Sequence, residues 1–158
     1  MSKPLTRLVL GASLVFLAPA TSPAQEAAAA NPVRAKYTKH EFKIRMRDGA
    51  TLFTAVYTPK DITRAYPFMM IRTPYSVAPY GIDNYRTSLG PSGLFQDEGF
   101  IFVYQDVRGR YMSEGVFLET TPHKPVKRTP QDVDESSDTF DTIEWLLKNL
   151  KGHNGKAG

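Results

Sequence analysis

Two short segments hold the residue types with which this chain would do chemistry. Residues 71–75 (IRTPY) overlap the end of an apolar run at 67–72. Residues 105–115 (QDVRGRYMSEG) follow a second apolar run at 99–104. Such short continuous runs between turn residues are typical of strands buried on both faces. Ligands of doubly wound sheets collect at the carboxyl ends of such strands, so we expect Tyr75 where a substrate would meet it.

The second segment also contains a charged pair, Asp106 and Arg108. A carboxylate and a guanidinium this close in sequence can form strong, charge-assisted hydrogen bonds. Charged pairs at the ends of buried strands usually stabilise the scaffold and do not react. The sequence therefore predicts a structural role for both residues, at the edge of the site.

Metal and cofactor chemistry finds little support in the residue pattern. The chain has no cysteine, and its histidines, His40, His123 and His153, have no second histidine at metal-ligand spacing. The acidic series from 132 to 138 resembles the start of a calcium loop, but Ser137 stands where that loop needs glycine. No glycine-rich phosphate loop follows a strand. We expect neither a metal nor a cofactor.

A nucleophile for covalent catalysis is not visible either. The sequence contains no G-x-S-x-G turn, which places the serine of many hydrolases between a strand and a helix. The loop serines without that turn are Ser76, Ser88, Ser92 and Ser113. A complete Ser-His-Asp set is therefore not legible in these 158 residues.

The elements that would position these residues begin with a hairpin. Residues 40–47 (HEFKIRMR) alternate strictly, with Phe42, Ile44 and Met46 on one face, as in a half-buried strand. Residues 48–49 (DG) suit a tight turn, and residues 51–58 are rich in β-branched and aromatic types. This order predicts an antiparallel β-hairpin.

A crossover then joins the two buried runs. Residues 73–98 contain several proline, glycine and serine residues, which are typical of turns, and one weak helical stretch at 85–96. Two buried strands joined by a crossover predict a parallel sheet. The fold class expected for the chain is therefore α/β.

The clearest helix follows a loop-like stretch at 107–136. We expect Ser137 or Asp138 to cap it, and Phe140, Ile143, Leu146, Leu147 and Leu150 to form its apolar stripe. Residues 153–158 (HNGKAG) lack any strand pattern, so no strand is predicted after this helix.

The amino terminus has the features of an export signal. Two basic residues precede an 11-residue apolar stretch at 8–18, and small residues with signal-peptidase spacing follow. The sequence predicts a signal peptide at 1–24, a flexible spacer at 25–36 and one domain at 37–158, in a periplasmic or extracellular protein. The predicted signal peptide contains two of the 20 basic residues and none of the 16 acidic ones. The remaining chain therefore has only two more basic than acidic residues. That small excess gives no reason to expect nucleic acid or membrane as a partner.

Four segments together resemble a known family. They are residues 46–52 (MRDGATL), 72–75 (RTPY), 105–115 (QDVRGRYMSEG) and 141–156, with its DTIEWL and NGK motifs. In this order and spacing they are similar to cocaine esterase, X-Pro dipeptidyl-peptidase and α-amino acid ester hydrolase. The course of residues 116–137 resembles the α-amino acid ester hydrolase branch most. The resemblance covers 37–158.

The resemblance implies an exported serine hydrolase of acyl esters or amides, acting on a small-molecule substrate without a cofactor. Members have an α/β-hydrolase domain with a Ser-His-Asp triad and are several times longer than this chain. A tyrosine after the third strand donates its hydroxyl to the oxyanion, and the matching residue here is Tyr75. The nucleophile, acid and histidine of the triad are absent, so we expect an amino-terminal fragment that is inactive alone.

Two further expectations follow from the incomplete α/β-hydrolase sheet, which would hold the hairpin, two buried parallel strands and crossover helices. Without a fifth strand, residues 68–71 would form an open apolar edge, and such edges pair with other chains. We therefore expect self-association. The alternative to a hydrolase fragment is a small exported module that binds a ligand, or that complements a second chain, without catalysis.

Overall fold

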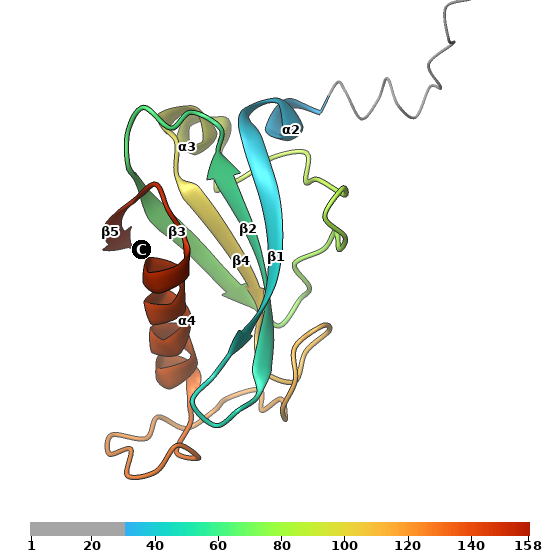
Figure 1. Cartoon of the computed structure of the whole chain (residues 1–158). Coiled ribbons are helices and arrows are strands. Elements are labelled where there is room, and N and C mark those ends of the chain that lie inside the picture. Colours follow the sequence, from blue (N-terminus) through green and yellow to red (C-terminus); the bar gives the residue numbers. More distant parts are fainter. Residues whose placement is uncertain (1–30) are drawn as a thin grey trace, which may run out of the picture.

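The computed structural model describes residues 31–158, which form a five-stranded mixed sheet with helices on both faces (Figure 1). The elements in chain order are α2 (Pro32–Lys36), β1 (Tyr37–Arg45), β2 (Thr51–Pro59), β3 (Tyr66–Thr73), α3 (Gly93–Glu98), β4 (Ile101–Asp106), α4 (Glu135–Asn149) and β5 (His153–Ala157). The strand order in the sheet is β1-β2-β4-β3-β5. The predicted α/β class is therefore confirmed.

The predicted hairpin is present. β1 and β2 pair antiparallel from Tyr37–Pro59 to Arg45–Thr51. Gly49 has φ 98°, a left-handed conformation that glycine adopts without a Cβ clash. Ile44 and Met46 are buried and Phe42 packs beside them, which places the alternating residues on the face that α4 covers.

β3 and β4 pair in parallel, as the two apolar runs predicted. All six residues of β4 are buried, because it lies between β2 and β3 with both faces covered. The paired residues of β3 and β4 end with Thr73 and Asp106, so both strands end at the same edge of the sheet. The crossover holds a single short helix, α3, which begins only at Gly93, later than the predicted 85–96 stretch.

Two apolar clusters lie on the two faces of this sheet. On one face, Val56, Phe68 and Val103 pack with Leu146 of α4. On the other, Tyr57, Phe102 and neighbouring aromatic side chains pack with Val77 and Leu89 of the crossover. α4 and the crossover loop accordingly lie on opposite sides of the strands in Figure 1.

Helix α4 begins earlier than predicted. Its N-cap is Asp134, not Ser137 or Asp138: the Asp134 carboxylate accepts from the Ser137 amide, while the Ser137 hydroxyl accepts from the Asp134 amide. The inward face contains Thr142 and Leu146, whereas Phe140 is 54% exposed. Placing Phe140 in the buried stripe was wrong, because it lies half a turn from Thr142 around the helix.

A fifth strand exists where none was predicted. β5 lies parallel to β3, and the backbone bonds Tyr66 N to Gly152 O (2.8 Å) and Met70 N to Gly158 O (2.8 Å) join them. Backbone groups of β3 make this pairing, so the polar and glycine residues of β5 gave no pattern to detect. The expected open edge at 68–71 is therefore covered as far as Met70, and self-association through that edge loses its basis.

The described part of the predicted spacer is ordered. Asn31 accepts hydrogen bonds from the amides of Val33 and Arg34 and caps α2, and the Val33 side chain is fully buried. The spacer prediction therefore does not hold for residues 31–36. The predicted signal peptide at 1–24 lies outside the described residues. Within 31–158, no helix has the length and apolar character to cross a membrane.

Candidate functional site

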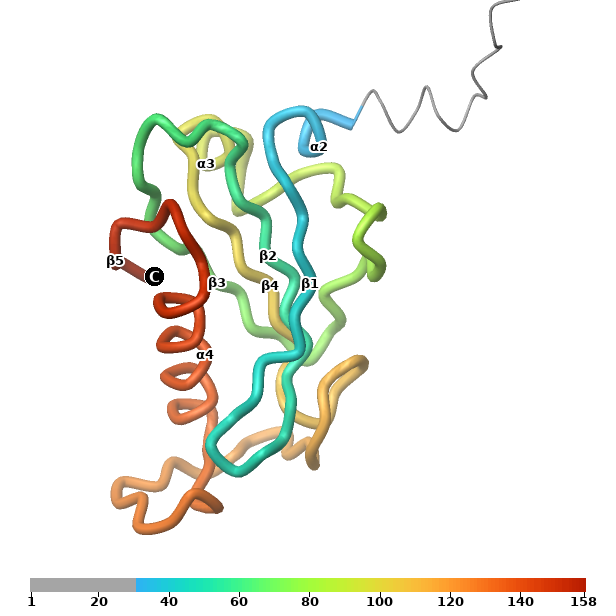
Figure 2. Tube along the Cα trace, in the orientation of Figure 1, coloured from blue at the N-terminus to red at the C-terminus, as the bar shows by residue number. Residues whose placement is uncertain are grey.

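The two segments singled out from the sequence meet at one edge of the sheet. The Val107 amide donates to the Thr73 carbonyl (3.2 Å), and the Arg110 side chain donates through Nε to the Pro74 carbonyl (3.1 Å). Figure 2 shows the loops after β3 and β4 and the turn of the β1–β2 hairpin at this end of the strands. The predicted meeting of the two strand exits is therefore observed.

Tyr75 is the most exposed aromatic residue of this edge. Tyr75 is 83% exposed, and its hydroxyl has no hydrogen-bond partner within residues 31–158. Its backbone is held, because its amide donates to Thr73 Oγ1 (3.0 Å). A free phenol on an anchored backbone can donate a hydrogen bond to a ligand, which is the chemistry predicted for Tyr75.

Asp106, the last residue of β4, is fully buried. Its Oδ1 accepts from the Val77 amide (3.0 Å), and its Oδ2 accepts from the Tyr80 hydroxyl (3.0 Å) and the Met112 amide (3.3 Å). Burial raises the pKa of Tyr80; the bond to Asp106 adds to this rise and a bond from Ser76 opposes it. Asp106 makes no ion pair within the described residues, so it does not pair with Arg108.

Arg108 instead joins three elements. It binds Asp48 of the hairpin turn (Nη1 to Oδ2, 2.7 Å) and Asp138 of α4 (Nη2 to Oδ1, 2.7 Å), each through two nitrogen atoms. The bond to Asp138 raises the pKa of Arg108 most, against the effect of burial, and Asp48 raises it further. Arg108 thus fixes the exit of β4 to the hairpin and to the start of α4.

Lys39 is a buried residue of this region that the sequence did not reveal. Its side chain is wholly buried, and Nζ donates to the carbonyls of Pro79 (2.7 Å), Gly81 (2.9 Å) and Asn84 (2.9 Å). It also lies 2.7 Å from Glu41 Oε1. Lys39 thereby ties the loop after Tyr75 to β1. Its main partners are backbone atoms, which no residue pattern identifies.

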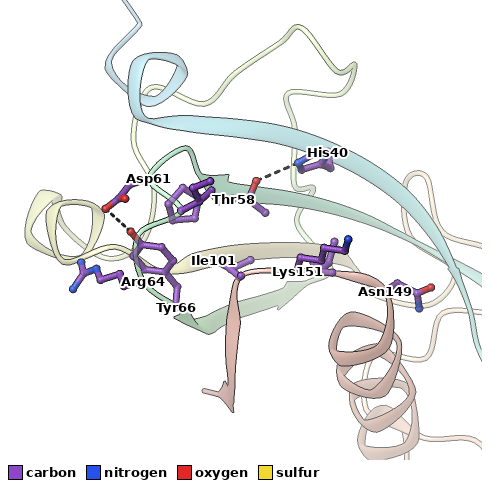
Figure 3. A pocket seen from close by; sticks show the side chains of 12 residues that line it. His40, Thr58, Asp61, Arg64, Tyr66, Ile101, Asn149 and Lys151 are labelled. Carbon is purple, nitrogen blue, oxygen red and sulfur yellow. Dashed lines mark hydrogen bonds between the residues drawn. The ribbon is translucent and has the colours of Figure 1, made fainter.

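Two of the cavities lined by residues 31–158 lie at opposite ends of the parallel strands. One of about 450 Å³ lies at the amino ends of the parallel strands, between Tyr66, Ile101 and the end of α4 (Figure 3). It is far along the strands from Tyr75 and contains none of the predicted site residues. A second, of about 490 Å³, lies beside Arg108 and Asp138 and has Val116 and Leu118 in its wall. Of these two cavities, the second lies at the edge where the two strand exits meet.

Comparison with known proteins places this geometry in a family. Residues 48–158 match the model of X-Pro dipeptidyl-peptidase (S15 family). The chain belongs to this family. This S15 chain is 31% identical over 105 residues to the cocaine esterase of Rhodococcus sp. (strain MB1 Bresler), which covers 66% of this chain and 16% of that protein. The family resemblance predicted from the motifs is confirmed.

Solved structures agree with the S15 assignment. An α-amino acid ester hydrolase matches with a TM-score of 0.66 and 37% identity, over 82% of this chain and 21% of that one. An aminopeptidase from a marine sediment archaeon, Thaumarchaeota archaeon, matches with a TM-score of 0.65 and 32% identity, over 92% of this chain and 23% of that one. The chain thus spans about a fifth of the length of these relatives, which are named as hydrolases of the esterase and peptidase kind.

No serine–histidine hydrogen bond occurs within residues 31–158 of this S15 chain. His40 Nε2 lies 3.2 Å from Thr58 Oγ1, and His153 Nε2 lies 3.1 Å from the Leu147 carbonyl oxygen. His123 faces Asp134 (3.2 Å). The same residues contain no cluster of three potential metal ligands. Within residues 31–158, the free Tyr75 hydroxyl therefore lies at the site edge, and no serine is paired with a histidine.

Proposed function

We propose that residues 37–158 form the carbonyl-polarising part of an exported serine hydrolase that acts on acyl esters or amides. The exposed Tyr75 hydroxyl, on an anchored backbone at the carboxyl edge of the sheet, supports this most directly. In this proposal the Ser-His-Asp triad belongs to polypeptide beyond these 158 residues, since the chain matches about a fifth of its relatives' length.

Attack of the serine on the substrate carbonyl places negative charge on the carbonyl oxygen. The Tyr75 hydroxyl donates to that oxygen as the charge develops, so it binds the transition state more strongly than the substrate. A donor of this kind typically contributes about 3 kcal/mol. The resemblance of residues 116–137 to the α-amino acid ester hydrolase branch makes α-amino acid esters the first substrates to test.

Ester hydrolysis by the purified chain tests the first half of this proposal. We expect no turnover of p-nitrophenyl esters, because no serine is paired with a histidine within residues 31–158. Turnover that Tyr75→Phe abolishes would contradict this expectation and place the nucleophile within the 158 residues.

The second half is tested by co-producing the chain with the polypeptide encoded downstream of it. We expect hydrolysis to appear, and Tyr75→Phe to lower kcat roughly 100-fold while KM changes little. Tyr111→Phe is the matched control, because Tyr111 is 55% exposed in the neighbouring loop and its ring stacks on Arg110 without this role. An unchanged kcat in Tyr75→Phe would rule out Tyr75 as the oxyanion donor.

A further inference from the structure

The residue that follows Tyr75 has an unusual backbone conformation. Ser76 has φ 74°, in the left-handed region that residues with a Cβ rarely adopt. Such a conformation costs about 1 kcal/mol or more and persists only where neighbouring groups enforce it. The direction in which the chain presents Tyr75 therefore depends on whatever holds Ser76.

A directed chain of hydrogen bonds holds it. The Tyr80 hydroxyl donates its proton to Asp106 Oδ2 (3.0 Å). The Tyr80 oxygen must then accept from Ser76 Oγ (2.9 Å). Ser76 Oγ in turn accepts from the Ala78 amide (3.2 Å). Each donor in this series of hydrogen bonds has one acceptor, and the series ends on the Asp106 carboxylate.

The other oxygen of Asp106 acts on the backbone directly. Oδ1 accepts from the Val77 amide, two residues after Tyr75. Oδ2 also accepts from the Met112 amide, which fixes the neighbouring loop against the same carboxylate. All three donors are neutral, and Asp106 is fully buried. A buried carboxylate without a cation is costly, and it is retained only where its hydrogen bonds are all made.

We propose that Asp106 is a positioning residue for the oxyanion donor: it sets the backbone path of residues 75–77 and so aims the Tyr75 hydroxyl at the carbonyl. This rests on the function proposed for Tyr75. It goes beyond loop bracing, because it predicts that substitution of Asp106 changes catalysis only through Tyr75.

The first test uses the 158-residue chain with tyrosine labelled by ¹³C at the ring, and with amide hydrogen exchange measured by NMR. We expect Asp106→Asn to shift the Tyr75 ring signal and to speed exchange of the Val77 amide at least tenfold. Tyr80→Phe should shift the same signals less, since it leaves the bond from the Val77 amide intact. Asp83→Asn is the control, because the Asp83 side chain is 82% exposed and makes only a weak contact with Arg34.

Tyr75 and Val77 signals that match the unsubstituted chain in a folded variant would overturn the proposal. If Asp106→Asn does not fold, Tyr80→Phe decides the question alone, since it removes one hydroxyl from a partly exposed ring.

The second test uses the active assembly described above. We expect Asp106→Asn to lower kcat roughly tenfold with KM unchanged, as a small misplacement of a catalytic group does. In the Tyr75→Phe background the same substitution should have no further effect. An equal loss of kcat in both backgrounds would assign Asp106 a structural role only. An unchanged kcat in Tyr75→Phe alone would refute the proposed function, whereas the NMR result would still report on Asp106.

Discussion

The exits of β3 and β4 lie side by side, yet different kinds of contact hold them. In the loop after β3, charged side chains bind backbone atoms: Lys39 donates to three carbonyls, and Asp106 accepts from the Val77 amide. After β4, Arg108 binds two other charged side chains, Asp48 of the hairpin turn and Asp138 of α4. The two loops thus use similar charges on different targets.

The two kinds of contact have different structural effects. Ion pairs between side chains join whole elements, here the hairpin, β4 and α4, and tolerate small changes in backbone path. A charge that binds several backbone groups fixes the path itself, because each amide or carbonyl must point at it. The loop with backbone-directed charges is the one that carries Tyr75. The comparison therefore predicts which substitutions disturb the scaffold and which disturb the donor.

The largest effect is expected at Lys39. Lys39→Met keeps the length of the side chain but leaves the three carbonyls and Glu41 without the cation that the wholly buried Lys39 side chain supplies. Removing one partner of a buried charged contact costs about 3–5 kcal/mol, so we expect a loss of about 4 kcal/mol in the free energy of unfolding. Urea denaturation measures this loss.

The control for Lys39 lies on the same strand. Lys43 is exposed, and Lys43→Met should change the free energy of unfolding by less than about 0.5 kcal/mol. If both lysine variants lose similar, small amounts, backbone-directed charge does not stabilise the loop after β3 and the comparison fails.

Arg108 is expected to give the next largest effect. Arg108→Ala separates the β4 exit from both Asp48 and Asp138, and we expect a loss of about 3 kcal/mol, because the Arg108 side chain is only 14% exposed. Arg108→Lys should recover part of it, since lysine keeps the charge without the two-pronged geometry. Thermal or urea unfolding measures both variants.

A double-mutant cycle between Arg108→Ala and Asp48→Ala sharpens the comparison. Because these side chains bind one another, we expect a coupling energy of about 1 kcal/mol or more. Tyr75 ring signals should stay in place in the folded Arg108 variants. A shift of Tyr75 as large as that caused by Asp106→Asn would show that the two exits are not held independently.

The same contrast explains what the sequence predicted. Alternation and apolar runs identified the hairpin and the parallel strands, since burial on one or both faces determines which residues occupy them. The meeting of Tyr75 with the Asp106 segment followed from the strand exits alone. β5 was missed because backbone pairing with β3 forms it, without an apolar face of its own.

The hydrogen-bond partners of the site residues could be predicted only where two residue types favour each other, as oppositely charged side chains do. Asp106 and Arg108 were expected to brace the loop, but each has partners distant in sequence: Arg108 binds residues 60 and 30 positions away. Asp106 and Lys39 mostly bind backbone atoms, which every residue possesses. The left-handed backbone conformation of Ser76 could likewise not be predicted from the sequence, because serine rarely adopts it.

The smallest effect appears at alkaline pH, on the side of the sheet that holds the loop after β3. Burial raises the pKa of Tyr57 from 10.0 to about 12, and its hydroxyl has no hydrogen-bond partner within the described residues. The unfolded chain loses this proton near pH 10 and the folded chain only near pH 12. The stabilisation is therefore complete below pH 10 and is lost as pH rises through 12.

Tyr57→Phe removes this titration without leaving a bond unmade. At pH 8 we expect its free energy of unfolding to match that of the unsubstituted chain or to exceed it slightly. Between pH 8 and pH 11 the variant should lose about 1 kcal/mol less than the unsubstituted chain does. Urea unfolding at the two pH values measures the difference. Parallel losses in the two proteins would mean that Tyr57 ionises as readily in the folded chain as in the unfolded one, and that the aromatic side of the sheet admits water where the structure shows it packed.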